Sequence, residues 1–225
     1  MGCRKCHQRH HTSICDQAEL LLVATGTRNS NVTYPVVLVQ VEGIKCRALL
    51  CTGAGSSYAS AALLDRISNR RCKKEVRKIE MMLGATTREV ELSTIEIKGI
   101  SGDFSMSVEV TKVNKSELLY IDNPRYQQLI DENPHLTGVK MEDLDTKDRL
   151  PVHVILGASE YVKLNTDSAP KIGQVGQPVA ELTQFGWTIL SPGKESVELP
   201  NNEARSLRRL ASLAKRLKRQ KLTTK

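Results

Sequence analysis

The stretch RALLCTGAGSSYAS, residues 47–60, decides the fold. An apolar run, Ala48-Leu49-Leu50, leads directly into the small and hydroxylated residues of Thr52–Ser57. A strand that ends in such a Gly-rich turn is typical of the active-site loop of a hydrolase. An acid would be expected where the strand meets the loop, but this chain has Cys51 there.

The residues around this loop predict further strands. Val36–Val41 and Ile44–Leu50 are rich in β-branched residues and flank Glu42-Gly43, which predicts a hairpin. Residues 57–68 carry apolar side chains at helical spacing and predict a short helix. Three more strand-like runs follow, with Gly84–Thr87 expected as the tip of a hairpin between the first two: Val76–Leu83, Glu89–Ile97 and Phe104–Val113.

The second half of the chain predicts a polar excursion followed by buried strands. Residues 114–150 are polar, and one short helix is expected near Tyr126–Ile130. Their acids lack the spacing of a calcium-binding loop and predict a solvated loop: Glu142, Asp143, Asp145 and Asp148. VHVILGASEYVKL (152–164) predicts a buried strand that breaks at Gly157, and QPVAELTQFGWTILSPG (177–193) predicts a final strand pair.

The N-terminal segment MGCRKCHQRHHTSICD, residues 1–16, has the composition of a zinc knuckle. Cys3 and Cys6 are spaced so that two thiolates can bind one side of the ion, and a His and Cys15 would complete the tetrahedron. His10 and His11 both fit the spacing; we favour His11, so the predicted ligands of a structural Zn²⁺ are Cys3, Cys6, His11 and Cys15. A segment this short would depend on the metal for its folding.

The net charge of +8 is concentrated at the C-terminus. Residues 203–225 hold nine Lys and Arg side chains against one Glu, so the rest of the chain is neutral. Leucines recur on one face of 203–221, which predicts a basic amphipathic helix that contacts nucleic acid, directs nuclear import or is simply solvated. No apolar run could span a membrane, and the scattered cysteines favour an intracellular protein of the cytoplasm or nucleus.

The order of these motifs resembles one family. Three stretches carry the resemblance, CRALLCTGAGSSYAS (46–60), VHVILGASEY (152–161) and AELTQFGWTILSPG (180–193), and the knuckle CRKCHQRHHTSIC precedes them. Together they resemble the retropepsin-like aspartic peptidases, and most closely the peptidase segment of Pao/BEL-type LTR retrotransposon polyproteins. The resemblance covers roughly residues 3–193.

The resemblance implies an all-β fold, a retropepsin-like acid-protease barrel. The expected divisions are a knuckle (1–16), a peptidase domain (17–195) and a basic helical tail (196–225). It also implies a homodimer that cleaves a peptide or polyprotein with no cofactor, because each protomer supplies one carboxylate of a pair that shares a proton. Thr52 and Gly53 match the family's catalytic loop, and Cys51 occupies the position of the catalytic Asp. The flap tip, with Leu83, Gly84, Ala85 and Thr86, would contact substrate, and Ile155-Leu156-Gly157 would support the loop.

Cys51 puts the chemistry in question. A thiol cannot take the place of a carboxylate in a pair that shares a proton, so we expect a poor peptidase or none. A thiol nucleophile would need a base such as His153 within hydrogen-bond reach. The rival interpretation is a non-enzymatic protein that binds RNA or single-stranded DNA through the knuckle and the tail, with the β domain as a dimerisation scaffold.

Overall fold

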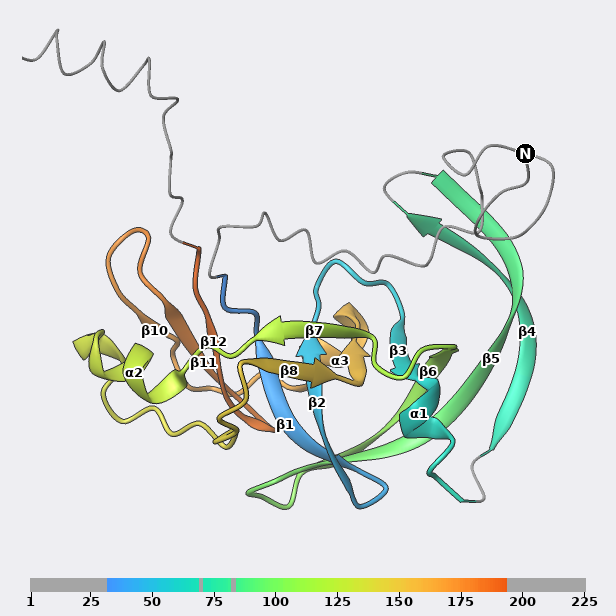
Figure 1. Cartoon of the computed structure of the whole chain (residues 1–225), viewed down its shortest axis with the longest axis horizontal. Coiled ribbons are helices and arrows are strands. Elements are labelled where there is room, and N and C mark those ends of the chain that lie inside the picture. The colour runs from blue at the N-terminus through green and yellow to red at the C-terminus, as the bar shows by residue number, and fades with distance from the viewer. Residues whose placement is uncertain (1–31, 69–70, 82–83, 194–225) are drawn as a thin grey trace, which may run out of the picture.

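The computed structural model describes residues 32–68, 71–81 and 84–193 (Figure 1). In these residues the fold is all-β, because short helices only connect or flank the strands. The predicted knuckle, the flap-tip residue Leu83 and the basic tail lie outside the described residues. None of the described helices is long and apolar enough to cross a membrane.

The predicted first hairpin is confirmed. Strand β1 (Val36–Val41) pairs antiparallel with β2 (Ile44–Leu50) through the turn at Glu42-Gly43. Both turn residues have positive φ, 46° and 80°, which is the conformation of a two-residue turn that follows the natural twist of a hairpin. Gly43 adopts it without steric cost.

A seven-stranded sheet forms the body of the protein, in the order β1-β2-β9-β3-β6-β5-β4. The remaining five strands after the hairpin are β9 (Val154–Leu156), β3 (Ser57–Ser60), β6 (Ser105–Val113), β5 (Gly84–Gly99) and β4 (Cys72–Met81). The sheet closes on itself because β1 also pairs with the end of β5, Val39 opposite Gly99 and Val41 opposite Ile97. β4 is left outside the closed part, paired only with β5 among the described strands.

The arrangement of β9 is the decisive topological feature. β2 and β3 are separated by only six residues in sequence, yet they do not pair with each other. β9 lies between them, parallel to β2 and antiparallel to β3, although it comes about a hundred residues later in the chain. The loop that joins β2 to β3 must therefore pass over the end of β9.

The core explains why β2 and β9 are apolar at successive positions. Leu50, Val154 and Leu156 point into the main core inside the closed sheet. Leu49 and Ile155 point to the opposite face, where a second apolar cluster is covered by the pair β7 (Leu119–Asp122) and β8 (Arg149–Val152). Side chains alternate between the faces of a strand, so strands covered on both faces lose the polar alternation of a surface strand.

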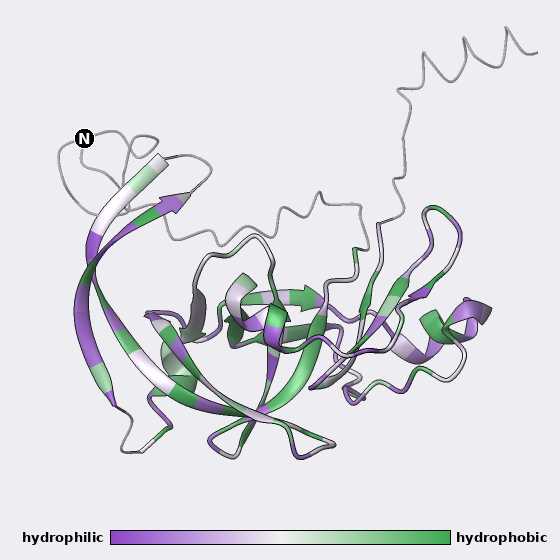
Figure 2. Cartoon of the chain, turned by 180° about the vertical axis from the view of Figure 1, so that it is seen from behind, coloured by the Kyte–Doolittle hydropathy of each residue, from purple (hydrophilic) through white to green (hydrophobic). Residues whose placement is uncertain are grey.

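A smaller unit lies beside the closed sheet. Strands β10 (Lys171–Ile172), β11 (Val179–Thr183) and β12 (Gly186–Leu190) form a three-stranded sheet. Helix α2 (Tyr126–Asp131) and the 3₁₀ turn η2 (Pro134–Leu136) share a third apolar cluster with it. Figure 1 shows this sheet at the opposite end of the molecule from the long β4–β5 hairpin, which curves away from the body. Figure 2 shows that much of β4 is hydrophilic, whereas the strands of the body carry the hydrophobic residues.

Two predicted boundaries are wrong. Residues 57–68 are not one helix: Ser57–Ser60 form β3, and only Ala61–Leu64 form helix α1, capped by the hydroxyl of Ser60. Pairing with β6 and β9 overrides the helical spacing there. The expected tip Gly84–Thr87 belongs to β5, with Gly84 opposite Met81 and Thr87 opposite Lys78. The helix α2, the strand that ends at Gly157 before helix α3 (Ala158–Lys163), and the final strand pair agree with prediction.

Candidate functional site

The loop 51–56 is held in place by main-chain hydrogen bonds. The N–H of Cys51 donates to the carbonyl of Leu156 at 2.9 Å. The N–H of Ala54 donates to the carbonyl of Cys51 at 3.2 Å, and the carbonyl of Ala54 accepts from the N–H of Ala158 at 2.9 Å. The loop is thus fixed to the end of β9 at its start and at its middle. None of these bonds uses the Cys51 side chain.

Gly157 lies directly beneath this loop. A Cβ at this position would stand 2.8 Å from the carbonyl oxygen of Ala54 and 2.9 Å from the backbone of Ser56. Only glycine allows this approach of two backbones. Buried Ser57 completes the support, because its hydroxyl accepts from the N–H of Gly157 at 3.0 Å and donates to Glu160 at 2.6 Å. The sequence assigned no such role to Ser57 or Glu160.

Gly157→Ala should therefore destabilise the protein by about 1–3 kcal/mol, because the new methyl group has to displace rigid backbone. The change in free energy of unfolding can be measured by urea denaturation. Gly55→Ala is the matched control: Gly55 lies in the loop that rests on Gly157, and a Cβ there would meet nothing within 4 Å. If Gly157→Ala lowered the free energy of unfolding no more than Gly55→Ala does, the close approach of Gly157 to the loop backbone would be contradicted.

Of the three residues predicted at the catalytic loop, two are exposed and one is partly buried. Thr52 and Gly53 are exposed, and a Cβ on Gly53 would meet nothing within 4 Å. Cys51 is partly buried and packs with Tyr58 against the second apolar cluster. Burial raises the pKa of Tyr58, Arg77 opposes this shift, and the charge of a Cys51 thiolate adds to it. Thr52 and Gly53 thus face solvent, while the Cys51 side chain lies beside Tyr58.

His153 does not serve Cys51 as a base. The N–H of His153 donates to the carbonyl of Arg47, and its carbonyl accepts from the N–H of Ser60. It is therefore level with a residue four positions before Cys51, which is about 13 Å along a strand. Its Nδ1 lies 3.0 Å from the Ser60 hydroxyl, and burial lowers its pKa. The arrangement of a Cys51 nucleophile with His153 is thus not formed.

A groove runs between the loop and the β4–β5 hairpin. One cavity of about 350 Å³ is lined by Gly55 and Ser56 on the loop side and by Arg77–Glu80 of β4. A second cavity of about 490 Å³ is lined by Arg88 and Lys115, among others, and by no residue of the loop 51–56. The two cavities share four lining residues, Tyr58, Ile79, Val90 and Thr111, so they adjoin each other. We call the two cavities together the hairpin groove.

The predicted substrate-binding residues of the hairpin do not line the groove. Gly84, Ala85 and Thr86 belong to β5, pair with β4 and line neither cavity, and Leu83 is outside the described residues. Whether they contact a substrate stays a prediction. Sequence reasoning missed Ile79 and Val90, which line the groove. The only feature of the sequence that could have identified these two residues is that each is apolar and lies between charged neighbours.

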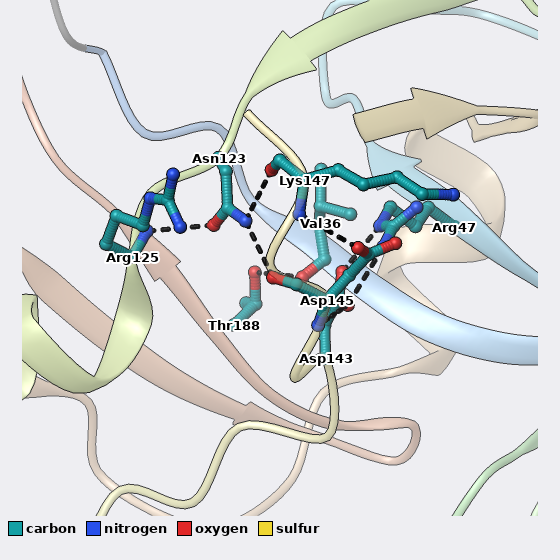
Figure 3. Close-up of polar contacts among 8 residues, drawn as sticks. All are labelled: Val36, Arg47, Asn123, Arg125, Asp143, Asp145, Lys147 and Thr188. Atoms are coloured by element: carbon teal, nitrogen blue, oxygen red, sulfur yellow. Dashed lines mark hydrogen bonds and ion pairs between the residues drawn. The ribbon is translucent and has the colours of Figure 1, made fainter. Parts of the chain in front are cut away.

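A buried ion cluster around Arg47 was also missed. The Arg47 guanidinium on β2 donates to both oxygens of Asp143, at 2.5 and 3.0 Å, and to Asp145 at 3.0 Å (Figure 3). The side chains of Arg47 and Asp143 are each only 9% exposed. Burial lowers the pKa of Arg47, but the bonds to the two carboxylates more than offset this and raise it. The prediction that Asp143 belongs to a solvated loop is therefore wrong.

Asn123 and the backbone around Asp145 extend this cluster. The Asn123 amide donates to the carbonyls of Asp145 and Lys147, and its side-chain oxygen accepts from the N–H of Arg125. A hydrogen bond from the Lys147 backbone and then the Arg47 guanidinium lower the pKa of Asp145. Every carboxylate of this cluster has a partner, so the arrangement is that of a structural anchor.

No cluster of three or more His, Cys, Asp or Glu side chains suited to a metal occurs in residues 32–68, 71–81 and 84–193. The predicted ligands Cys3, Cys6, His11 and Cys15 are outside these ranges. No model of a known protein family matches the chain, and no curated protein matches it. The site must therefore be interpreted from its own geometry.

Proposed function

We propose that the β domain is a retropepsin-like aspartic endopeptidase scaffold in which Cys51 has replaced the catalytic acid, so that the native chain has little or no peptidase activity. The observation that supports this best is the insertion of β9 between β2 and β3, with Gly157 beneath the Cys51–Ser56 loop. The hairpin groove adds support, because it lies beside this loop and is covered by a long hairpin.

The proposed chemistry requires two copies of the chain. In an aspartic peptidase two close carboxylates share one proton and activate a water molecule that attacks the peptide carbonyl. A domain with a single loop of this kind supplies one of the two groups, so the site would form on the axis of a homodimer. Replacing Asp with Cys in the one gene then removes both carboxylates, and with them the group that accepts and returns the proton.

The experiment that tests this function compares the native chain with Cys51→Asp on peptides that have an apolar centre. Cleavage by the Asp variant alone would support an intact scaffold with a disabled site. Equal cleavage by both would overturn the assigned role of position 51. No cleavage by either, with a folded and dimeric variant, would contradict the peptidase scaffold itself.

The homodimer makes a separate prediction about Cys51. Two symmetry-related thiols near the axis should form a disulfide under mild oxidation with copper phenanthroline, provided their Cα atoms approach within about 4.4–6.8 Å. Non-reducing electrophoresis should then show a covalent dimer. Cys51→Ser should abolish it, whereas Cys72→Ser, which removes an exposed thiol on β4, should not. A dimer band that persists in Cys51→Ser would argue against loops that meet at the axis.

Binding of RNA or single-stranded DNA by the knuckle and the tail stays a prediction, since both segments are outside the described residues. If it occurs, chelation of Zn²⁺ should release metal and nucleic acid together.

A further inference from the structure

The charges along the hairpin groove are not balanced. Its two cavities are lined by six cationic side chains and three acidic ones: Lys74, Arg77, Lys78, Arg88, Lys112 and Lys115 against Glu80, Glu89 and Glu91. The body of the chain outside the basic C-terminal segment is neutral overall. The groove therefore concentrates positive charge locally.

Most of these cations have partners within the protein. Lys74 pairs with Glu89 at 3.0 Å, and Lys78 pairs with Glu80 at 2.6 Å. Lys112 contacts Asp65 at 2.7 Å and Glu91 at 3.9 Å. Arg77 reaches Glu109 on β6 at 3.0 Å. Such pairs are already neutralised and offer little attraction to a ligand.

Arg88 and Lys115 differ from the other groove cations in lacking an acidic partner within the described residues. Within the described part of the chain, neither side chain has an ion pair or a hydrogen bond to an acid. Both line the larger cavity, and neither lines the cavity beside Gly55 and Ser56. The uncompensated cations of the groove thus belong to the cavity that no residue of the Cys51–Ser56 loop lines.

The part of the groove shared by the two cavities is mainly apolar. Tyr58, Ile79 and Val90 line both cavities and present mainly apolar surface. A ligand that fills the groove would therefore place an apolar group between these residues and an anionic group beyond them. An extended peptide, which advances about 3.3 Å per residue, can present two such side chains from one short segment.

We propose that the hairpin groove selects extended peptide segments with an apolar residue next to the Cys51 loop and an Asp or Glu side chain in the larger cavity, where Arg88 and Lys115 bind the carboxylate. This inference rests on the proposed function, because it names the class of peptide that the same site takes. Arg88 and Lys115 are specificity-determining residues in it and take no part in bond cleavage.

A peptide suits the groove better than a nucleic acid strand. Single-stranded nucleic acids bind where several aromatic side chains stack on successive bases along a basic channel. The groove offers one aromatic residue, Tyr58, and its walls carry Glu80, Glu89 and Glu91, which would repel a continuous polyanion. A peptide with a single acid meets only the uncompensated cations.

The test uses three fluorescein-labelled peptide libraries with a fixed Leu-Leu centre and otherwise uncharged flanks. They differ in one flanking residue, which is Glu, Gln or Lys. Fluorescence anisotropy with the full native chain should show the Glu library binding about tenfold more tightly than the Gln library, as expected for two exposed charge pairs. The Lys library should bind more weakly than both.

The double variant Arg88→Gln, Lys115→Gln should bind the Glu and Gln libraries equally. Lys98→Gln is the matched control, because Lys98 is an exposed cation on the same strand β5 but does not line the groove. It should retain the tenfold preference. A preference that survives the double variant, or that Lys98→Gln also removes, would overturn the inference.

Two further arms separate this inference from the function on which it rests. In the Cys51→Asp background, equal cleavage of the Glu and Gln libraries would overturn the inference and leave the peptidase scaffold standing. If neither binding nor cleavage were detected, the inference and the proposed function would both be overturned. A labelled oligothymidylate is the fourth probe: if the double variant weakened its binding but left the peptides unaffected, Arg88 and Lys115 would belong to a nucleic acid site instead.

Discussion

Cys51→Asp should raise kcat/KM for an apolar-centred peptide by at least about a hundredfold over the native chain. General acid–base assistance contributes on the order of 10²–10⁴ in rate, and the variant regains it in both protomers of the proposed dimer. The rate should depend on pH as a bell-shaped curve, because only the pair with one shared proton is active. Initial rates across the acidic range would measure this.

The Cys51–Ser56 loop should keep its position in this variant, because that position does not depend on the Cys51 thiol. Main-chain bonds to Leu156 and Ala158 fix it from below, and Thr52 and Gly53 remain exposed on its outer side. Cys51→Asn is the matched control: it has the shape of Asp but cannot hold or release a proton. Cleavage by Cys51→Asn at the rate of Cys51→Asp would rule out the acid–base explanation.

Arg47→Met should lower the free energy of unfolding by about 3 kcal/mol, since it leaves the buried carboxylate of Asp143 without its charge partner. The loss is large because Asp143 is almost fully covered. Thermal or urea unfolding would measure it. Arg125→Met is the control, because the Arg125–Asp148 pair is exposed and should contribute no more than about 1 kcal/mol.

A second variant separates the buried charge from the lost packing. The double change Arg47→Met, Asp143→Leu removes both charges and should recover most of the stability, because apolar side chains can replace a buried ion pair at little cost. If the double variant were as unstable as the sum of the two single variants, the pair would not be coupled. The excursion around Asp143 would then be held by other contacts.

The sequence alone predicted the all-β class and much of the element order. The β1–β2 hairpin followed from β-branched residues on both sides of Glu42-Gly43, and the strand that ends at Gly157 followed from its apolar run. These are local signals, which act through neighbours in the chain. The resemblance to aspartic peptidases also singled out Cys51, because it implies an acid at that position.

Only the tertiary structure decided what the loop rests on and what faces it. The helical spacing of residues 57–68 was misleading because Ser57–Ser60 pair with β6 and β9, which are distant in sequence. Likewise, Arg47 and Asp143 are 96 residues apart, and no local pattern marks either as buried. Arg88 and Lys115 carry a proposed role only because folding brings them to one cavity. Local preferences select strands and turns, whereas sites arise from contacts between distant residues that the closed sheet brings together.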